Sequence, residues 1–85
     1  MSEFKGTKGK WEIEFDTASL QKHIKCGNKY IAEVSFGNVE NNSNAKLIES
    51  APEMLGFLYS IESSENTPAE YRRQAKQLIK KATEL

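Results

Sequence analysis

The only histidine and the only cysteine of the chain lie three positions apart, at His23 and Cys26. A cysteine nucleophile needs a base within hydrogen-bond reach, but on a strand this odd spacing sends the two side chains to opposite faces. Two ligands also fall short of the three or four that zinc takes from a protein. We therefore predict an exposed histidine and a half-buried cysteine, with no catalytic pair and no metal site.

Three carboxylates follow one another at every second position, in Glu12, Glu14 and Asp16. Paired carboxylates perform acid–base chemistry where their surroundings separate their pKa values, whereas these share the solvated face of a strand. The sequence contains no P-loop, no G-x-G-x-x-G and no H-E-x-x-H motif. We predict that the protein is not an enzyme and uses no cofactor.

Cationic side chains gather in two segments although the net charge is zero, with 12 Lys and Arg against 12 Asp and Glu. This balance argues against general nucleic-acid binding. A local cationic patch suits a small anionic ligand or an acidic protein surface, and a merely solvated helix face is the alternative. Trp11 or Tyr30 would stack on a base, although Trp11 also fits a core position, and Asn44 either caps a helix or bonds to a ligand. The candidate ligand-binding residues are Trp11, Lys22, Lys25, Lys29, Tyr30, Asn44 and Arg72.

The elements that position these residues belong to a small protein of 85 residues. No apolar run approaches the roughly 20 residues of a membrane span, and the N-terminal segment lacks the apolar core of a signal peptide, so we expect a soluble protein. A single cysteine excludes an intrachain disulfide. Residues 1–9 are predicted to form a flexible N-terminal arm, and residues 10–85 a single α+β domain.

Alternating apolar residues predict three strands, at Trp11–Phe15, Leu20–Lys25 and Tyr30–Phe36. Tyr30, Ala32, Val34 and Phe36 are expected on one face of the third strand. Gly27-Asn28 is typical of a tight hairpin turn. These segments predict a three-stranded antiparallel meander.

The second half of the chain follows helical spacing. We expect a short helix over residues 44–49. A second helix is expected from Ser50 to Ser63, because Ser50-Ala51-Pro52-Glu53 has the S-x-x-E capping pattern with proline in the first turn. A third is expected over Pro68–Thr83, with its buried stripe formed by Tyr71, Ala75, Leu78, Ile79 and Ala82. The predicted order is β-β-β-α-α-α, with three helices packed on one face of the sheet.

Apolar residues wrap more than one side of the expected second helix. A chain this short buries a marginal core, and self-association is a common remedy. Gly56 costs a helix about 1 kcal/mol relative to alanine, which is tolerable where another backbone approaches closely. We expect a homodimer or higher homo-oligomer, unless the sheet and third helix cover this helix. The predicted oligomer interface is Met54, Gly56, Phe57, Tyr59 and Ile61.

Four segments resemble a large family of small tailed-phage accessory proteins, mostly of unassigned function: Thr7–Ile13, Gly27–Val34, Asn44–Leu55 and Gln77–Thr83. Its members share a Gly-x-Trp strand, an Ile-Ala-x-Val strand and an Asn-Ala-x-Leu-Ile-x-x-Ala-Pro-x-Leu-Leu helix pair. The resemblance implies a phage protein made in the cytoplasm of an infected bacterium. It also implies that such a protein acts by binding.

Two functions are compatible with that implication, and a third is less specific. The first is a counter-defence homo-oligomer that sequesters a nucleotide-type host immune signal. The second is an anti-CRISPR-like protein–protein inhibitor of a host defence component, acting through its sheet face or third helix. The third is a structural or regulatory phage accessory protein. The expected partners are therefore a second copy of the chain and either a small anionic nucleotide or a host defence protein, with no membrane.

Overall fold

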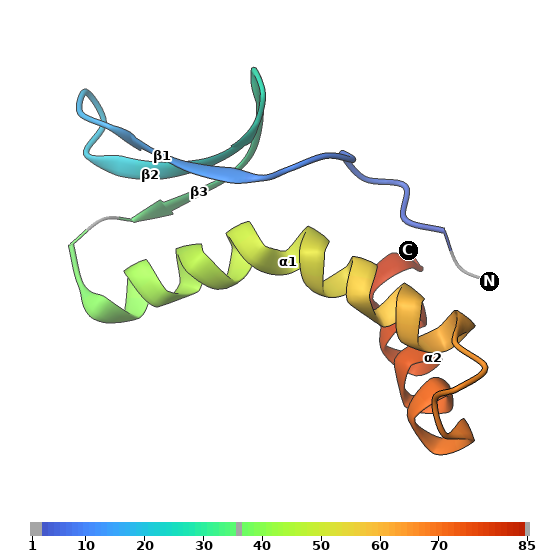
Figure 1. Ribbon diagram of the computed structural model, residues 1–85. Coiled ribbons are helices and arrows are strands. Elements are labelled where there is room, and N and C mark those ends of the chain that lie inside the picture. The colour runs from blue at the N-terminus through green and yellow to red at the C-terminus, as the bar shows by residue number, and fades with distance from the viewer. Residues whose placement is uncertain (1–2, 36, 85) are drawn as a thin grey trace. The chain divides into compact units, whose positions relative to one another are not determined.

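The computed structural model describes residues 3–35 and 37–84. Three strands precede two helices, as Figure 1 shows: β1 (Glu12–Asp16), β2 (Gln21–Cys26), β3 (Lys29–Ser35), α1 (Val39–Ser63) and α2 (Ala69–Thr83). The chain divides into two compact units. We call Thr7–Pro52 the sheet unit. The helical unit is bounded by Met1–Gly6 and Glu53–Leu85, of which residues 3–6 and 53–84 are described.

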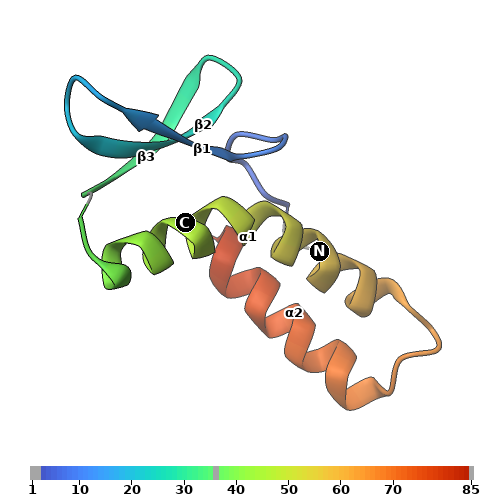
Figure 2. The same ribbon diagram turned by 60° about the vertical axis from the view of Figure 1, so that its left-hand side comes forward.

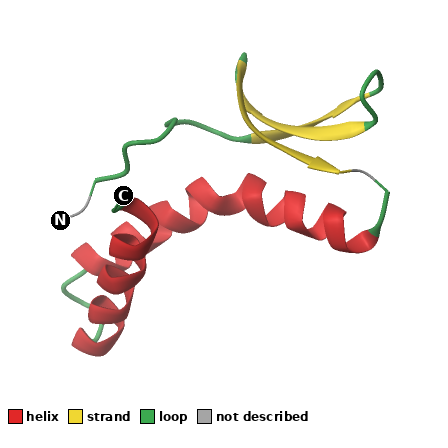
Figure 3. Ribbon diagram, turned by 180° about the vertical axis from the view of Figure 1, so that it is seen from behind, coloured by secondary structure: helices red, strands yellow, loops and turns green. Residues whose placement is uncertain are grey.

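The strands form one antiparallel sheet in the order β1-β2-β3, which confirms the predicted meander (Figure 3). Each predicted strand lies within one residue of an observed one, because alternation of apolar and polar residues is a direct signal of a half-buried strand. Gly27 occupies the turn between β2 and β3 with φ +60°, a conformation that glycine adopts without steric cost. Phe36, expected on the third strand, lies outside the described residues.

The core of the sheet unit is built around Ile24 of β2 and Ala45 of α1, both fully buried. The first half of α1 lies along the sheet (Figures 1 and 3). A hydrogen bond joins the two elements: the backbone N–H of Ile13 donates to Oε2 of Glu49 over 3.0 Å. Strand β1 is at the edge of the sheet, so the Glu49 carboxylate satisfies an N–H that has no neighbouring strand.

Helix α1 begins five residues earlier than the sequence predicted, at Val39. The reason is an N-terminal cap at Asn38, whose Oδ1 accepts a hydrogen bond from the Asn41 N–H over 2.7 Å. Its backbone carbonyl also accepts from the Asn42 N–H over 3.1 Å. The polar run after Asn38 resembles a loop because asparagine and serine are weak helix formers. The cap and the tertiary contacts of Ala45 outweigh that weak propensity.

The prediction of three helices was wrong, because the two expected segments 44–49 and 50–63 are one continuous helix. Pro52 lies inside α1 and does not start a helix. Proline removes the one backbone bond that would reach the carbonyl four residues earlier, and its ring crowds that turn. Beginning a separate helix requires a new costly nucleus, whereas good helix formers stand on both sides of this proline. The observed order is therefore β-β-β-α-α.

In the helical unit, the C-terminal part of α1 and α2 form a hairpin (Figure 2). Helix α2 begins one residue after the predicted start, with Pro68 as its N-cap. The expected buried stripe is only partly correct. Ala75 and Ile79 are buried as predicted, together with Thr83, whereas Tyr71, Leu78 and Ala82 are exposed. The apolar stripe of α2 is thus wider than the part that the hairpin covers.

We predict that Asn38→Ala lowers the free energy of unfolding by about 1 kcal/mol, because the helix loses its N-cap acceptor. Asn44→Ala is the matched control. Asn44 is exposed in the interior of α1, and its side chain forms no hydrogen bond with the residues that the structure describes. This control should be neutral or slightly stabilising, since alanine is the better helix former. Urea denaturation followed by circular dichroism measures both, and equal effects would contradict the cap.

Candidate functional site

The strand register collects polar side chains on one face of the sheet. Glu14 and Glu33 flank His23 in one cross-strand row, and Glu12 and Tyr30 flank Lys25 in the next. Asp16 continues the face along β1, since side chains two residues apart share a face. We call this surface the polar sheet face, and define it as Glu12, Glu14, Asp16, His23, Lys25, Tyr30 and Glu33.

A register shift places Tyr30 on this face. Ile24 pairs with Ala32 but Lys25 pairs with Tyr30, which leaves Ile31 as an extra residue in β3. One extra residue reverses the alternation on its far side. The expectation that Tyr30 shares a face with Ala32 and Val34 was therefore wrong. The ring of Tyr30 instead meets the His23 ring edge to face, with centroids 5.1 Å apart at an interplanar angle of 88°.

Lys25 lies between an aromatic ring and a carboxylate. Its Nζ is 4.9 Å from the centroid of the Tyr30 ring and 3.6 Å from Oε2 of Glu14. Both contacts are attractive for an ammonium group. The one lysine of the polar sheet face is thus already engaged within the sheet.

His23 is more covered than predicted, with a side-chain exposure of 12%. Its Nε2 is 3.9 Å from Oδ2 of Asp16 and 4.0 Å from Oε1 of Glu33. These separations are too long for hydrogen bonds, and they become ion pairs when the imidazole is protonated. Cys26 points to the other face, where its Sγ is 3.5 Å from the carbonyl oxygen of Lys8. The prediction that His23 and Cys26 do not meet is confirmed.

Asp16 organises the turn that follows β1. Its Oδ1 accepts a hydrogen bond from the Ala18 N–H, and its Oδ2 accepts one from the Ser19 hydroxyl, both over 3.0 Å. The Ala18 bond, followed by the Ser19 bond, lowers the pKa of Asp16 below its ordinary value of 3.8, because both favour the ionised carboxylate. This carboxylate therefore stays charged to unusually low pH at one end of the polar sheet face.

A shallow pocket of about 340 Å³ opens on the third strand. It is lined by His23, Tyr30, Ile31, Ala32 and Glu33. Four of these five residues are consecutive in β3, so the pocket follows the edge strand at the point where the extra residue changes the register. Its chemistry combines an exposed aromatic ring, an imidazole and a carboxylate, which together recognise polar or cationic groups.

Among the predicted ligand-binding residues that lie in the strands, the structure brings together Lys25 and Tyr30. Lys22 pairs with Phe15 and Val34 on the opposite face, and Lys29 pairs with Cys26 there. Lys22 and Lys25 differ by three positions, so the parity rule that separated His23 from Cys26 also separates them. The same rule, used with the register, would have found His23 and Glu33, which the prediction omitted.

The remaining candidates, Trp11, Asn44 and Arg72, lie outside the three strands. Trp11 is half-buried just before β1, and its Nε1–H donates to the Thr7 carbonyl over 3.1 Å. Asn44 is exposed on α1. Arg72 belongs to the helical unit, where its Nε–H donates to the Thr67 carbonyl over 3.0 Å. Trp11 and Arg72 therefore each form a hydrogen bond with a carbonyl group that is close in sequence.

The charge of the polar sheet face is dominated by carboxylates. This face holds four carboxylates, against one lysine and one histidine: Glu12, Glu14, Asp16 and Glu33.

Within residues 3–35 and 37–84, no group of three or more His, Cys, Asp or Glu side chains is arranged to hold a metal ion. None of the helices described is both long and apolar enough to cross a membrane.

A polar face on a three-stranded meander is shared by many unrelated proteins, so the family assignment comes from sequence comparison. The model of a phage protein family, described as Salmonella phage P22 protein Y8K6, matches residues 1–84. The chain belongs to this family. The predicted resemblance to small phage proteins is confirmed at that level. Comparison with curated proteins and with solved structures gave no match.

We predict that the carboxyl of Asp16 titrates with a midpoint below 3.8 in NMR spectra recorded against pH. Because its folded pKa is lower than the unfolded value of about 3.9, its contribution to stability is complete above the unfolded value. That contribution is lost as the pH falls through the folded value. Ser19→Ala should move the midpoint upward, since one donor to the carboxylate disappears. Thr17→Ala is the control, and a midpoint that is the same in all three proteins would refute the turn geometry.

Proposed function

We propose that the protein is a non-enzymatic phage protein that binds a host protein in the bacterial cytoplasm, with the polar sheet face as its contact surface. The observation that carries the proposal is the pocket on β3, where an exposed Tyr30 ring lies beside His23 and Glu33. Tyrosine and other aromatic residues are enriched at protein–protein contacts, because a rigid ring gives a large contact area at low entropic cost. For a member of a phage protein family, we propose a counter-defence role as an inhibitor of a host defence component.

The charge around the pocket favours a cationic partner surface. Glu33 lines the pocket, and Asp16 and Glu14 lie on the same face. Lys25 is already paired with Glu14 and with the Tyr30 ring. An arginine or lysine of the partner would find the same two kinds of group that hold Lys25, an aromatic ring and a carboxylate. A phosphate would meet mainly negative charge.

Sequestration of a nucleotide-type immune signal by a homo-oligomer is the second candidate. It is favoured by one observation: the cation of Lys25 and the stacking surface of Tyr30 lie side by side next to the pocket. A base would stack on the ring and a phosphate would approach the ammonium group. Against it, Lys22 and Lys29 lie on the opposite face of the sheet.

We predict that Tyr30→Ala and Glu33→Lys each weaken binding to a host protein target by at least about 30-fold, which corresponds to a central contact worth about 2 kcal/mol. Lys29→Ala is the matched control, because Lys29 is exposed on the same strand but pairs with Cys26 on the opposite face. Quantitative affinity capture from host extract compares the three variants with the natural chain. A target retained equally by all four proteins would exclude the polar sheet face.

We predict that cyclic dinucleotides, cyclic trinucleotides and ADP-ribose derivatives give no binding heat in isothermal titration calorimetry, because carboxylates outnumber cations around the pocket. Saturable heat that disappears in both Lys25→Ala and Tyr30→Ala would establish the nucleotide candidate instead. A stacked base alone is worth about 1–3 kcal/mol, so the loss would be measurable.

A further inference from the structure

Among the described residues of the helical unit, four large apolar side chains are exposed and one, Ile79, is fully buried, while Leu55, Leu58 and Ile61 are half-buried. Ala75 and Ile79 are the buried hydrophobic residues among its described residues. On α1, Met54 is 43% exposed and Phe57 is 67% exposed. On α2, Tyr71 is 58% exposed and Leu78 is 52% exposed. Exposed apolar side chains that are contiguous, and not scattered singly, mark an interaction surface.

These side chains form one apolar flank on each helix. Met54 and Phe57 are three residues apart, so they are neighbours on the surface of α1. Tyr71 and Leu78 are seven residues apart, which is two helical turns and the spacing of a coiled-coil seam. Both lie beside the buried stripe of Ala75 and Ile79 on α2. A helix from another molecule can therefore pack on either flank without disturbing the contact between α1 and α2.

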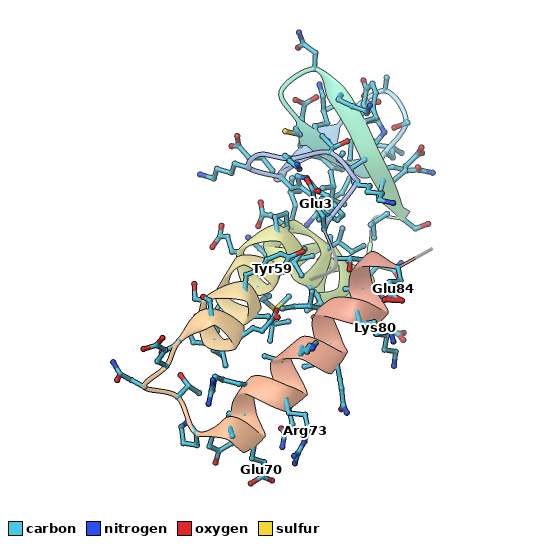
Figure 4. The ribbon with its side chains drawn as sticks, turned by 90° about the vertical axis from the view of Figure 1, so that its right-hand side faces the viewer. Glu3, Tyr59, Glu70, Arg73, Lys80 and Glu84 are labelled. Atoms are coloured by element: carbon cyan, nitrogen blue, oxygen red, sulfur yellow. The ribbon has the colours of Figure 1, made fainter. Side chains whose placement is uncertain are left out.

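The two helices carry opposite charge. From Glu53 to Ser63, α1 contains Glu53 and Glu62 and no lysine or arginine. Helix α2 has one acidic residue, Glu70, against five basic residues: Arg72, Arg73, Lys76, Lys80 and Lys81. Arg73 and Lys80 project from the surface of α2 in Figure 4. Arg73 and Lys81 form no ion pair with the residues that the structure describes.

This charge distribution selects one arrangement for a helix that packs on the exposed flanks. The charges nearest the exposed flanks are Glu53 on α1 and Lys81 on α2, because Glu62 and Arg72 are half-buried. Contact between two α1 segments would bring two Glu53 carboxylates together, and contact between two α2 helices would place two strongly cationic helices side by side. Contact between α1 of one molecule and α2 of another brings opposite charges together. A second copy of the chain offers both surfaces at once, so a two-fold axis makes the favourable contact twice.

We propose that two copies of the protein associate through their helical units, with Met54 and Phe57 of one copy packed against Tyr71 and Leu78 of the other. The contact keeps Met54 and Phe57 of the interface predicted from sequence, and adds two residues that the sequence pattern assigned to the core. Gly56 is outside it, because a residue two positions from Met54 lies on another side of the helix. A Cβ at Gly56 would meet no heavy atom within 4 Å.

The area is adequate for a reversible dimer. Four such side chains expose roughly 100 Å² each, so two copies bury on the order of 800 Å² through them alone, and charged residues at the rim add to this. Stable interfaces bury about 1,200–2,000 Å² in total. We therefore expect association that depends on concentration in the micromolar range.

Sedimentation equilibrium of the full chain over a wide concentration range tests the proposal. We expect the mass to rise from that of one chain, 9.6 kDa, to twice that value. Phe57→Ser and Leu78→Ser should each raise the dimer dissociation constant at least tenfold. Both positions are exposed in the single chain, so the fold should survive, which circular dichroism verifies. Gly56→Ala is the matched control, and its dissociation constant should not change.

A charge-reversal pair distinguishes the proposed contact from other dimers. Glu53→Lys and Lys81→Glu, which lie next to the α1 and α2 flanks, should each weaken the dimer, and the double variant should recover most of the loss. Only contact between α1 and α2 of different copies predicts this recovery. A single-chain mass at every concentration, an unchanged constant in Phe57→Ser, or no recovery in the double variant would overturn the proposal. Tyr30→Ala should leave the dimer intact, so failure here is separable from failure of the polar sheet face.

Discussion

The extra residue at Ile31 determines what the sheet presents to solvent. In a strand without it, Tyr30 would share a face with Ala32 and Val34, and the aromatic ring would point away from His23. With it, β3 contributes Tyr30 and Glu33 to the same face. The contacts of Lys25 and His23 with the Tyr30 ring both depend on this shift. A bulge changes the direction of side chains locally while the rest of the ladder keeps its hydrogen bonds. The sheet therefore places Tyr30 beside Glu33 on one face without losing its strand pairing.

The two units differ in how completely they bury their apolar side chains. The sheet unit covers Ile24 and Ala45 completely and links strand and helix through the Glu49 carboxylate. The helical unit buries Ile79 and Ala75 but leaves Met54, Phe57, Tyr71 and Leu78 exposed. A short chain buries a small fraction of its surface on folding, and the residues left outside are available for contact with other molecules.

The sequence predicted those features that depend on neighbours along the chain. The alternation in Trp11–Phe15 and the Gly27 turn predicted the meander, and Pro68 predicted the start of α2 to within one residue. It did not predict features that depend on competition between distant groups. Ser50–Glu53 has the local pattern of a helix start, yet continuity of α1 is the more stable outcome. Nothing in Tyr30-Ile31-Ala32 marks the bulge, because all three are compatible with an inward position. For the same reason, residue type alone placed Lys25 and Tyr30 among the candidates, whereas recognising that His23 and Glu33 share their face required the strand register.

The hydrogen bond from Ile13 to Glu49 has a consequence for how the protein behaves at high concentration. An open strand edge is a template on which another chain can add a strand, and repeated addition leads to fibrous aggregates. On β1, an incoming strand would first have to displace a charged side chain from a backbone donor. On β3, the bulge interrupts the regular spacing of donors and acceptors that a straight strand needs. Both edges of this three-stranded sheet therefore resist templated growth.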